Sequence, residues 1–330
     1  MNPMPASQAE PSRIRIAIHG GAGDLAPGAG PQPLQRAALL RIASAARQVL
    51  LDGGTALDAV EAAVVLLEEC PLFNAGIGGV LNRDGLPELD AAIQRGSDRG
   101  CGAVTGVMRT RSPIRLARAV MERSPHVLFS GPGAEQLGRE LGLPEVEPAY
   151  FVTHERLVQL EAARSKGIIT LDHDSDFDRA QKSAPPDPAF GTVGAVARDA
   201  WGGLAAATST GGLTNKHPGR IGDTPLVGMG TFADDRSAAI SCTGTGESFI
   251  KACFGHEVHA RMAYEGWELS RACQHALDEV LHYGGRGGCI AIDHEGRISL
   301  PFNSYVMFRA WGHADGEIHT GVGPEDGPAP

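Results

Sequence analysis

The chain has 330 residues, with 39 acidic against 29 basic side chains and a formal net charge of −10. Nucleic-acid-binding proteins usually carry a basic stripe, so this charge argues against a nucleic-acid partner. The 42% hydrophobic and 21% charged residues are ordinary for a globular protein, and the 44 glycines, about twice the usual share, indicate many tight turns. A large α/β fold routinely uses this length as one domain.

Residues 1–12 contain prolines and polar side chains but no apolar core of an export signal, so they are predicted to be a disordered tail. Apolar stretches such as 56–67 are interrupted by acidic residues and are too short to span about 30 Å of hydrocarbon. We therefore expect no membrane segment and a cytoplasmic protein. The six cysteines include no C-x-x-C pair, and we expect them to be reduced and mostly buried.

Strand and helix patterns alternate in the first half of the chain. The alternating RIRIAI of residues 13–18 predicts a strand that ends at the glycine-rich segment 19–23. Pro71 stops a helix, and residues 73–79 are too rich in glycine for regular structure. The predicted elements are strands at 13–18, 87–94 and 103–108, and helices at 34–51, from Thr55 to about 69, at 113–122, from 133, and at 155–164.

A polar segment at 172–188 contains too little apolar surface to offset the entropy of ordering it, and it is predicted to be an exposed linker. Directly after it, 192–199 and 203–209 predict a hairpin of two buried strands around Gly202. Further strands are expected at 238–242 and 288–292, with helices from about 247 and 270. The mixture of helices and strands in both halves favours an α/β fold.

Several familiar motifs can be excluded. The aspartates at 172–178 imitate a calcium loop, but Phe177 and Ser183 stand where such a loop needs glycine and glutamate. The Gly-x-Gly runs lack the third glycine of a dinucleotide site, and there is no Walker lysine. The HGG of residues 19–21 resembles an esterase oxyanion loop, but no G-x-S-x-G nucleophile motif occurs.

What remains is the junction of Gly191 and Thr192, where the polar linker meets a buried strand. A threonine hydroxyl is a weak nucleophile unless a base lies beside it, and the amine of an N-terminal threonine can be that base. Chain cleavage before Thr192 would therefore create nucleophile and base on one residue. The dipeptide alone is equally compatible with an ordinary strand that begins after a loop.

Six sequence blocks change that balance: HGGAG, LEECPLFNAGIG, GTVGAVA, ATSTGG with TNK, GRIGD and TGTGE. In this order and spacing they resemble the plant-type asparaginase and isoaspartyl peptidase family, over about residues 14 to 315. The resemblance implies a four-layer αββα sandwich of the N-terminal-nucleophile hydrolase type. It also implies self-cleavage between Gly191 and Thr192, which would leave an α subunit, 13–191 with a flexible linker at 172–190, and a β subunit, 192–330, in one folded domain.

The same resemblance assigns roles to individual residues. Thr192 would be the nucleophile and Thr210 would hold its hydroxyl, although an ordinary strand-end threonine fits the sequence too. Arg220 and Asp223 would bind the substrate's α-carboxylate and α-ammonium, unless they pair with each other on the surface. The remaining assignments are Gly222 near the substrate, Thr243 and Gly244 as oxyanion hole and substrate contacts, and Asn74 steadying the nucleophile's surroundings.

No catalytic cofactor is expected, but relatives of this family bind a structural sodium ion through backbone carbonyls of one loop. The matching positions here are Leu67, Glu68, Cys70, Phe73, Ala75 and Ile77. Glycine-rich loops also close without metals. Met229 departs from the small residue that relatives commonly carry near the Asp223 loop, which puts the preferred leaving group in question.

The resemblance predicts an amidohydrolase that releases L-aspartate from L-asparagine and β-aspartyl dipeptides through a Thr192 ester. It also predicts small-molecule substrates as partners and a dimer of processed units. A glycosylasparaginase-like hydrolase uses the same nucleophile and is the alternative within this class. An unprocessed aspartate-binding protein that uses Arg220 and Asp223 without catalysis is the alternative outside it.

Overall fold

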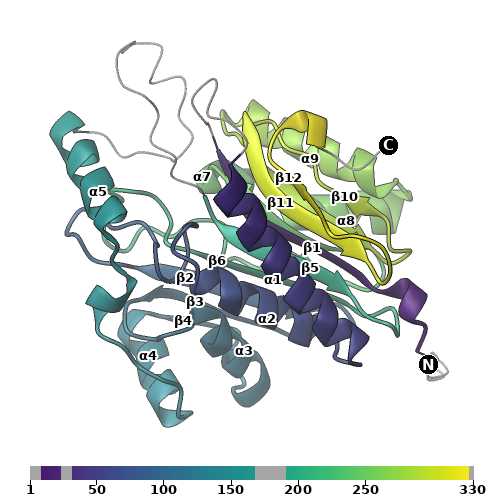
Figure 1. Ribbon diagram of the computed structural model, residues 1–330, viewed down its shortest axis with the longest axis horizontal. Helices are drawn as coiled ribbons and strands as arrows, with labels where there is room; N and C mark the ends of the chain where they lie inside the picture. The colour runs from purple at the N-terminus through teal and green to yellow at the C-terminus, as the bar shows by residue number, and fades with distance from the viewer. Residues whose placement is uncertain (1–8, 24–31, 168–190, 327–330) are drawn as a thin grey trace.

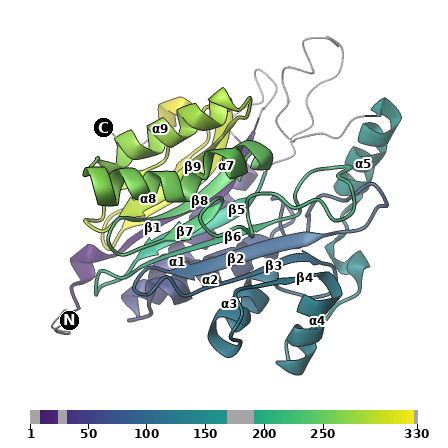
Figure 2. The ribbon, with the colours of Figure 1, turned by 180° about the vertical axis from the view of Figure 1, so that it is seen from behind.

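Two β-sheets lie face to face between outer layers of helices in this computed structural model, which describes residues 9–23, 32–167 and 191–326 (Figures 1 and 2). The fold is therefore mixed α/β, as the sequence predicts. Helices α1, α2 and α3 cover the outer face of the larger sheet, and α7, α8 and α9 cover that of the smaller one. The predicted linker 172–188 lies outside the described residues, as do residues 1–8 of the predicted tail.

The larger sheet interleaves strands from both sides of residue 191, with β1 between β5 and β11, and β6 beside β2. Its order is β12 (His319–Gly321), β11 (Val306–His313), β1 (Arg15–Gly23), β5 (Val193–Arg198), β6 (Leu204–Thr210), β2 (Leu89–Arg95), β3 (Cys101–Val107) and β4 (Leu128–Ser130). The smaller sheet has the order β10 (Ile298–Ser299), β9 (Gly287–Asp293), β8 (Ala238–Gly244) and β7 (Thr231–Ala233).

Most helices begin and end close to their predicted bounds. They are α1 (Pro33–Leu51), α2 (Ala56–Glu68), α3 (Pro113–Arg123), α4 (Gly131–Glu140), α5 (His154–Lys166), α7 (Gly246–Ala252), α8 (Phe254–Glu265) and α9 (Leu269–His282), with short 3₁₀ turns at Pro11–Arg13, Pro148–Phe151 and Pro324–Asp326. Residues 9–12 of the expected tail are held in place, because the Glu10 backbone N–H donates to the Ala200 carbonyl at 2.8 Å.

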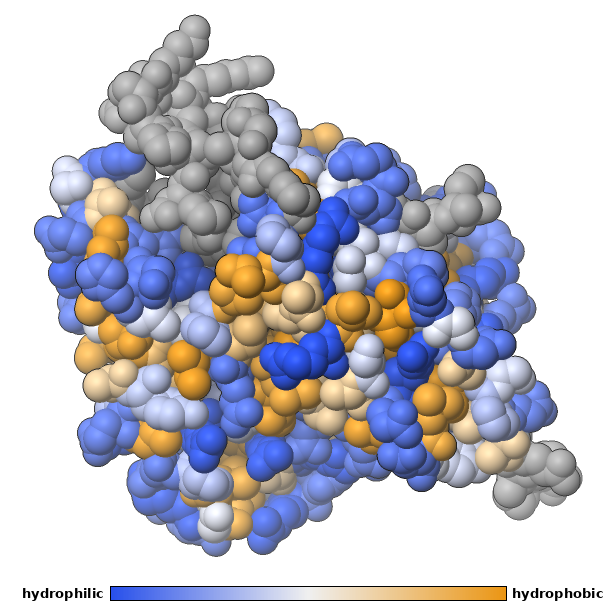
Figure 3. All heavy atoms as spheres, viewed as in Figure 1, coloured by the Kyte–Doolittle hydropathy of each residue, from blue (hydrophilic) through white to orange (hydrophobic). Residues whose placement is uncertain are grey.

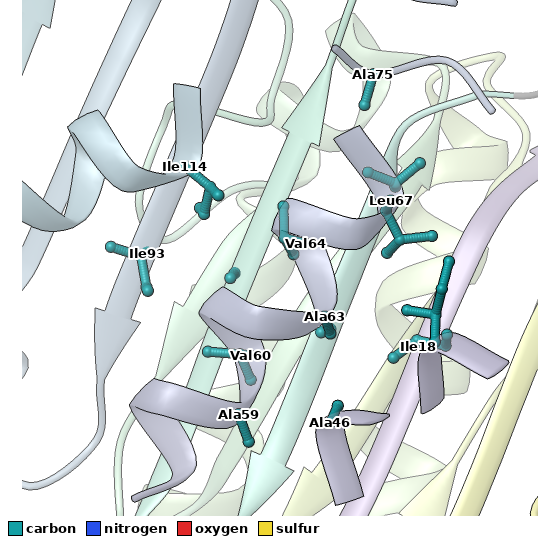
Figure 4. Packing of buried hydrophobic residues seen from close by; sticks show 14 of the residues in the cluster. Ile18, Ala46, Ala59, Val60, Ala63, Val64, Leu67, Ala75, Ile93 and Ile114 are labelled. Atoms are coloured by element: carbon teal, nitrogen blue, oxygen red, sulfur yellow. The ribbon is translucent and has the colours of Figure 1, made fainter. Parts of the chain in front are cut away.

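Three apolar cores separate the layers: one between the larger sheet and its helices, one between the two sheets, and one between the smaller sheet and its helices. Figure 4 shows Val60, Val64 and Leu67 of α2 in one cluster with Ile18 of β1 and Ile93 of β2. Because strands of the larger sheet have a core on each face, both sets of their alternating side chains are buried.

One strand was predicted too short and others were missed. The prediction that the first strand ends at His19 is wrong: β1 continues to Gly23, with an irregularity in register between His19 and Gly21. Strand β11, which the sequence analysis did not identify, supplies the partner that makes this extension possible. Arg309 interrupts the apolar pattern of β11, so the sequence of this segment does not indicate a strand clearly.

The β5–β6 hairpin determines where the site lies. In its antiparallel register Val193 is opposite Ser209, so Thr192, just before β5, lies beside Thr210 at the end of β6. Strand β8 of the second sheet packs against both strands of this hairpin. The start of β5 and the ends of β6 and β8 therefore lie at one edge of the sandwich.

The surface over α1 and α2 mixes polar and apolar side chains, with apolar ones gathered near its centre (Figure 3). Leu34, Leu40 and Leu51 of α1 are exposed.

Within the described ranges, no helix combines the length and apolar character needed to cross a membrane. Four of the six cysteines are buried, Cys101 is half-buried, Cys253 is exposed, and none forms a disulfide.

The capping box of α2 gives a first prediction. Thr55 Oγ1 accepts from the Asp58 N–H, and the Asp58 carboxylate accepts from the Thr55 N–H. Replacing Thr55 by Ala should cost about 1 kcal/mol of unfolding free energy, whereas Thr55→Ser keeps the oxygen and most of the stability. Urea unfolding measures both, and an equal loss in the two variants would contradict the capping role.

Candidate active site

A pocket opens where the β5–β6 hairpin, the end of β8 and the loops after β6 meet. It brings together most of the residues that the sequence analysis selected. Those that line it are Gly191, Thr192, Thr210, Gly212, Leu213, Arg220, Gly222, Asp223, Thr224, Gly244 and Gly246. Thr243 and Asn74 are not among the lining residues.

The two predicted threonines are in direct contact. Thr192 Oγ1 donates to Thr210 Oγ1 at 3.0 Å, and Thr210 Oγ1 also accepts the Gly212 N–H at 2.9 Å. Both side chains are buried, with 8% of Thr192 and 2% of Thr210 exposed. Because the Gly212 N–H holds Thr210 Oγ1 in place as an acceptor, Thr192 Oγ1 is oriented toward it before any substrate arrives.

The Gly191 peptide lies tightly against β1. An atom at the Cβ position of Gly21 would come within 2.6 Å of the Gly191 N, and closer still to its O, and the Gly21 φ of +115° favours glycine. The HGGAG segment therefore packs directly against the backbone at the junction before Thr192. Glycine at 21 is required here by close backbone approach rather than by a ligand.

Asn74 connects two loops behind the threonine pair. Its side-chain Nδ2 donates to the Gly212 carbonyl at 2.9 Å, and its Oδ1 accepts the Val80 N–H at 2.9 Å. Its own carbonyl accepts the Gly211 N–H at 3.2 Å. These bonds hold the turn whose N–H binds Thr210, which supports the expectation that Asn74 steadies the nucleophile's surroundings.

Arg220 faces the pocket but is already paired with a residue that the sequence analysis did not assign. Its Nε and Nη2 donate to the two carboxylate oxygens of Glu247 at 2.9 and 2.7 Å, and it forms no ion pair with Asp223. The Arg220 side chain is 15% exposed, whereas Glu247 is half exposed. A Cβ at Gly222 would lie 2.9 Å from Arg220 Nη1, so glycine at 222 gives the guanidinium room beside the pocket.

Asp223 is a buried acid with an unused oxygen. Only 3% of it is exposed, and its Oδ2 has no hydrogen-bond partner among the described residues. Burial raises the pKa of this carboxyl from 3.8 to about 7, and the Arg220 charge opposes that shift only in part. A cation entering the pocket would favour the ionised carboxylate, so the residue suits recognition of an ammonium.

Thr243 and Gly244 end β8, opposite the glycines Gly288 and Gly287 of β9. Thr243 is fully buried, and its Oγ1 accepts the Ala22 N–H of β1 at 3.0 Å, which leaves its own O–H available to donate. Gly244 has a φ of +146°, and a Cβ there would come 2.6 Å from the Gly287 Cα. The Phe249 ring also lies 2.9 Å from that Cβ position, so both backbone and an aromatic side chain pack against Gly244 and favour glycine there.

The predicted sodium loop follows α2. The carbonyls of Leu67, Glu68 and Cys70 already accept the N–H groups of Cys70, Ile77 and Phe73 at 3.2, 2.7 and 3.3 Å. A carbonyl oxygen has a second lone pair, so these bonds leave room for a hard cation. Among the described residues there is no group of three or more His, Cys, Asp or Glu side chains that could hold a metal ion. A cation at this loop would therefore be bound by backbone carbonyls.

The Glu68 carboxylate has a separate, structural position. It accepts from Ser112 Oγ and the Ile114 N–H at 2.6 and 2.9 Å, and from Ser209 Oγ at 2.8 Å. Burial raises its pKa to about 7 despite these hydrogen bonds. It connects the end of α2 to the residue before Thr210.

Met229 does not line the pocket. Its backbone carbonyl accepts the Gly255 N–H at 3.2 Å and the Cys242 thiol at 3.7 Å. The lining residues that the sequence analysis did not assign are Gly212, Leu213, Thr224 and Gly246. Gly212 and Gly246 lie inside the sequence blocks that carry the family resemblance, and Leu213 and Thr224 lie directly beside such blocks. Their place in or next to these blocks was the available signal.

Comparison with known proteins matches residues 12–322 to a family described as asparaginase. An isoaspartyl peptidase of Salmonella typhimurium is 51% identical over 312 residues, which cover 93% of this chain and 97% of that protein. An isoaspartyl peptidase of Escherichia coli K12 is 50% identical over 319 residues, covering 94% and 97%. A human isoaspartyl peptidase/L-asparaginase is 39% identical over 323 residues, covering 94% and 96%.

The buried Asp223 carboxyl should destabilise the fold as pH rises. Its pKa is raised from 3.8 to about 7, so the unfolded chain ionises first and stability falls by roughly 4 kcal/mol between these two pH values. Asp223→Asn removes this effect, so its melting temperature should exceed that of the unchanged protein by an amount that grows from pH 4 to 7 and then levels off.

Asp98→Asn is the opposite-sign control for this measurement. Hydrogen bonds from Arg95 and the Gly100 N–H lower the pKa of Asp98 to about 2. The Asp98 charge therefore stabilises the folded protein, and Asp98→Asn should not raise the melting temperature at any pH. A difference between Asp223→Asn and the unchanged protein that stays constant from pH 4 to 8 would contradict the raised pKa.

Proposed function

Because this chain belongs to the asparaginase family, we propose that it is an amidohydrolase that releases L-aspartate from β-aspartyl dipeptides and from L-asparagine. The observation that carries this proposal is the Thr192 hydroxyl, buried, hydrogen-bonded to Thr210 and exposed to the pocket directly after Gly191. The fold has the two sheets and flanking helices that an αββα N-terminal-nucleophile hydrolase requires.

Maturation begins with cleavage of the chain before Thr192. The Thr192 hydroxyl oxygen attacks the Gly191 carbonyl carbon, and the hydroxyl proton passes to the Thr192 nitrogen as the C–N bond breaks. The acyl group has then moved from nitrogen to oxygen as an ester, and the nitrogen is an amine. Water then hydrolyses the ester and leaves a carboxylate on Gly191 and a free amine on Thr192. The products, 1–191 and 192–330, stay together because β1 lies between β5 and β11 and because β2 pairs with β6.

The free amine then serves as base and acid in turn. It takes the Thr192 hydroxyl proton as the oxygen attacks the substrate's side-chain amide carbon, and it passes the proton to the departing amine. The acyl group remains on Thr192 as a β-aspartyl ester, which an activated water cleaves to aspartate. No cofactor is needed, since both proton transfers use one residue.

The negative oxygen that forms during each attack needs donors. Gly244 lines the pocket, and the Thr243 hydroxyl beside it accepts from Ala22 while its O–H remains available to donate. We assign the Gly244 N–H and the Thr243 O–H as the oxyanion hole. Losing one such donor typically costs about 2.7 to 4 kcal/mol of barrier.

The aspartyl part of the substrate carries one anion and one cation on its α-carbon. Arg220 Nη1 would bind the α-carboxylate beside Gly222, while Nε and Nη2 keep Glu247 as an orienting partner. The Asp223 carboxyl, which lines the pocket, would accept from the α-ammonium, and the ammonium would also return it to its ionised form. Both signs together select an α-amino acid.

Three further expectations from the sequence concern the ion, the assembly and the location of the protein. Structural sodium at the carbonyls of the loop after α2, a dimer of processed units and a cytoplasmic location all stay predictions.

Replacing the nucleophile tests the chemistry directly. Thr192→Ala should remain a single chain and lose at least about 1,000-fold in hydrolysis of β-aspartyl-leucine, because neither the hydroxyl nor a free N-terminal amine is present. Thr192→Ser keeps both and should retain cleavage and measurable turnover. Release of aspartate by purified Thr192→Ala at the rate of the unchanged protein would contradict the assignment.

A comparison of three substrates separates this function from its alternatives. We expect hydrolysis of β-aspartyl-leucine and of L-asparagine, and no turnover of GlcNAc-asparagine. Preferred cleavage of GlcNAc-asparagine would make the protein a glycosylasparaginase instead. Binding of aspartate without turnover of any of the three, by a single uncleaved chain, would make it a binding protein.

A further inference from the structure

Lys216 is a buried charge that the proposed chemistry does not use. Only 1% of this residue is exposed, and its ammonium Nζ donates to the carbonyl of Gly211 at 2.9 Å and to that of Glu88 at 2.7 Å. Removing an ammonium from water costs several kcal/mol, and a lost partner would leave it unpaired. The two carbonyls are therefore held firmly in place.

Acidic groups balance this charge. Asp90 is 1% exposed and is the strongest charged neighbour of Lys216, and Glu88 is the next. Asp90 is fixed in turn, since its Oδ1 accepts from Thr105 Oγ1 and the Gly106 N–H at 2.6 and 2.9 Å. In the β2–β6 register Asp90 lies directly opposite Thr210.

The Gly211 carbonyl connects the ammonium to the nucleophile. Gly211 lies between Thr210 and Gly212, and the Gly212 N–H donates to Thr210 Oγ1. A Cβ at Gly212 would come 3.0 Å from Lys216 Nζ, so the ammonium lies immediately under this turn. Asn74 binds the turn by the Gly211 N–H and the Gly212 carbonyl, which leaves the Gly211 carbonyl to Lys216.

We propose that Lys216 is a positioning residue for this reaction: its buried ammonium fixes the Gly211–Gly212 turn and, through it, the hydrogen bond between Thr210 and Thr192. This inference rests on the proposed function. Lys216 is not among the residues that line the pocket. It acts by holding the group that orients the nucleophile, so its loss should slow the chemical step more than it weakens substrate binding.

The test replaces Lys216 by Met, which keeps the apolar stem and removes the ammonium. We expect self-cleavage and kcat for β-aspartyl-leucine to fall at least 20-fold, with KM within threefold of that of the unchanged protein. Lys216→Gln keeps a neutral donor and should lose less. It also replaces Lys216→Met in the test if that variant does not fold.

Arg309→Met is the matched control. Arg309 is also 1% exposed and donates to two carbonyls, those of Met307 and Gly323, each at 2.8 Å, but it does not line the pocket. Both variants should melt at lower temperature, whereas kcat of Arg309→Met should stay within twofold. A kcat of Lys216→Met within twofold of the unchanged protein, or equal losses in the two variants, would overturn the inference.

The outcomes separate this inference from the proposed function. An unchanged protein that hydrolyses no β-aspartyl substrate overturns the proposed function, and crystal structures then decide the role of Lys216. A turn at Gly211 that has shifted in Lys216→Met, with the Thr192–Thr210 hydroxyl contact lengthened beyond 3.0 Å, supports it. An unmoved turn and contact refute it.

Discussion

The hydrogen bond between the hydroxyls of Thr192 and Thr210 is the contact on which the proposed chemistry depends, and most of the surrounding structure serves to hold it. The β5–β6 register brings the two residues together at one end of the hairpin. Cores on both faces of the sheet make that register costly to change, because a shift of one residue would exchange the buried faces. The loops around Thr210 are then fixed by Asn74 and Lys216.

The pocket combines this rigid nucleophile with charges that the fold holds at a cost. Burial raises the pKa of Asp223 and Asp90 and lowers that of Lys216, so each of these groups is less stable as an ion than it would be in water. Asp223 still has an unused oxygen, and Arg220 still has a nitrogen beside the pocket. An α-amino acid carries an ammonium for the Asp223 carboxylate and a carboxylate for the Arg220 guanidinium. The pocket would therefore favour an α-amino acid.

The sequence predicted elements whose signal is local, and it missed those that depend on distant partners. Thr55 marks the start of α2 by a capping box, and the turn at Gly202 fixed the hairpin. The extension of β1 past His19 depends on β11, whose pattern Arg309 interrupts. The Arg220–Glu247 pair and the burial of Lys216 join residues through the tertiary fold, and a charged side chain in a polar motif normally indicates an exposed loop.

The central claim is that one peptide bond breaks and frees an amine on the residue whose oxygen attacks. Intact mass under denaturing conditions, measured on protein that is actively hydrolysing β-aspartyl-leucine, tests it most directly. Two chains are expected, which correspond to residues 1–191 and 192–330, and the second begins with the sequence TVGAV. Active material that contains only the unbroken 34.5 kDa chain would contradict it, because the proposed base would not exist.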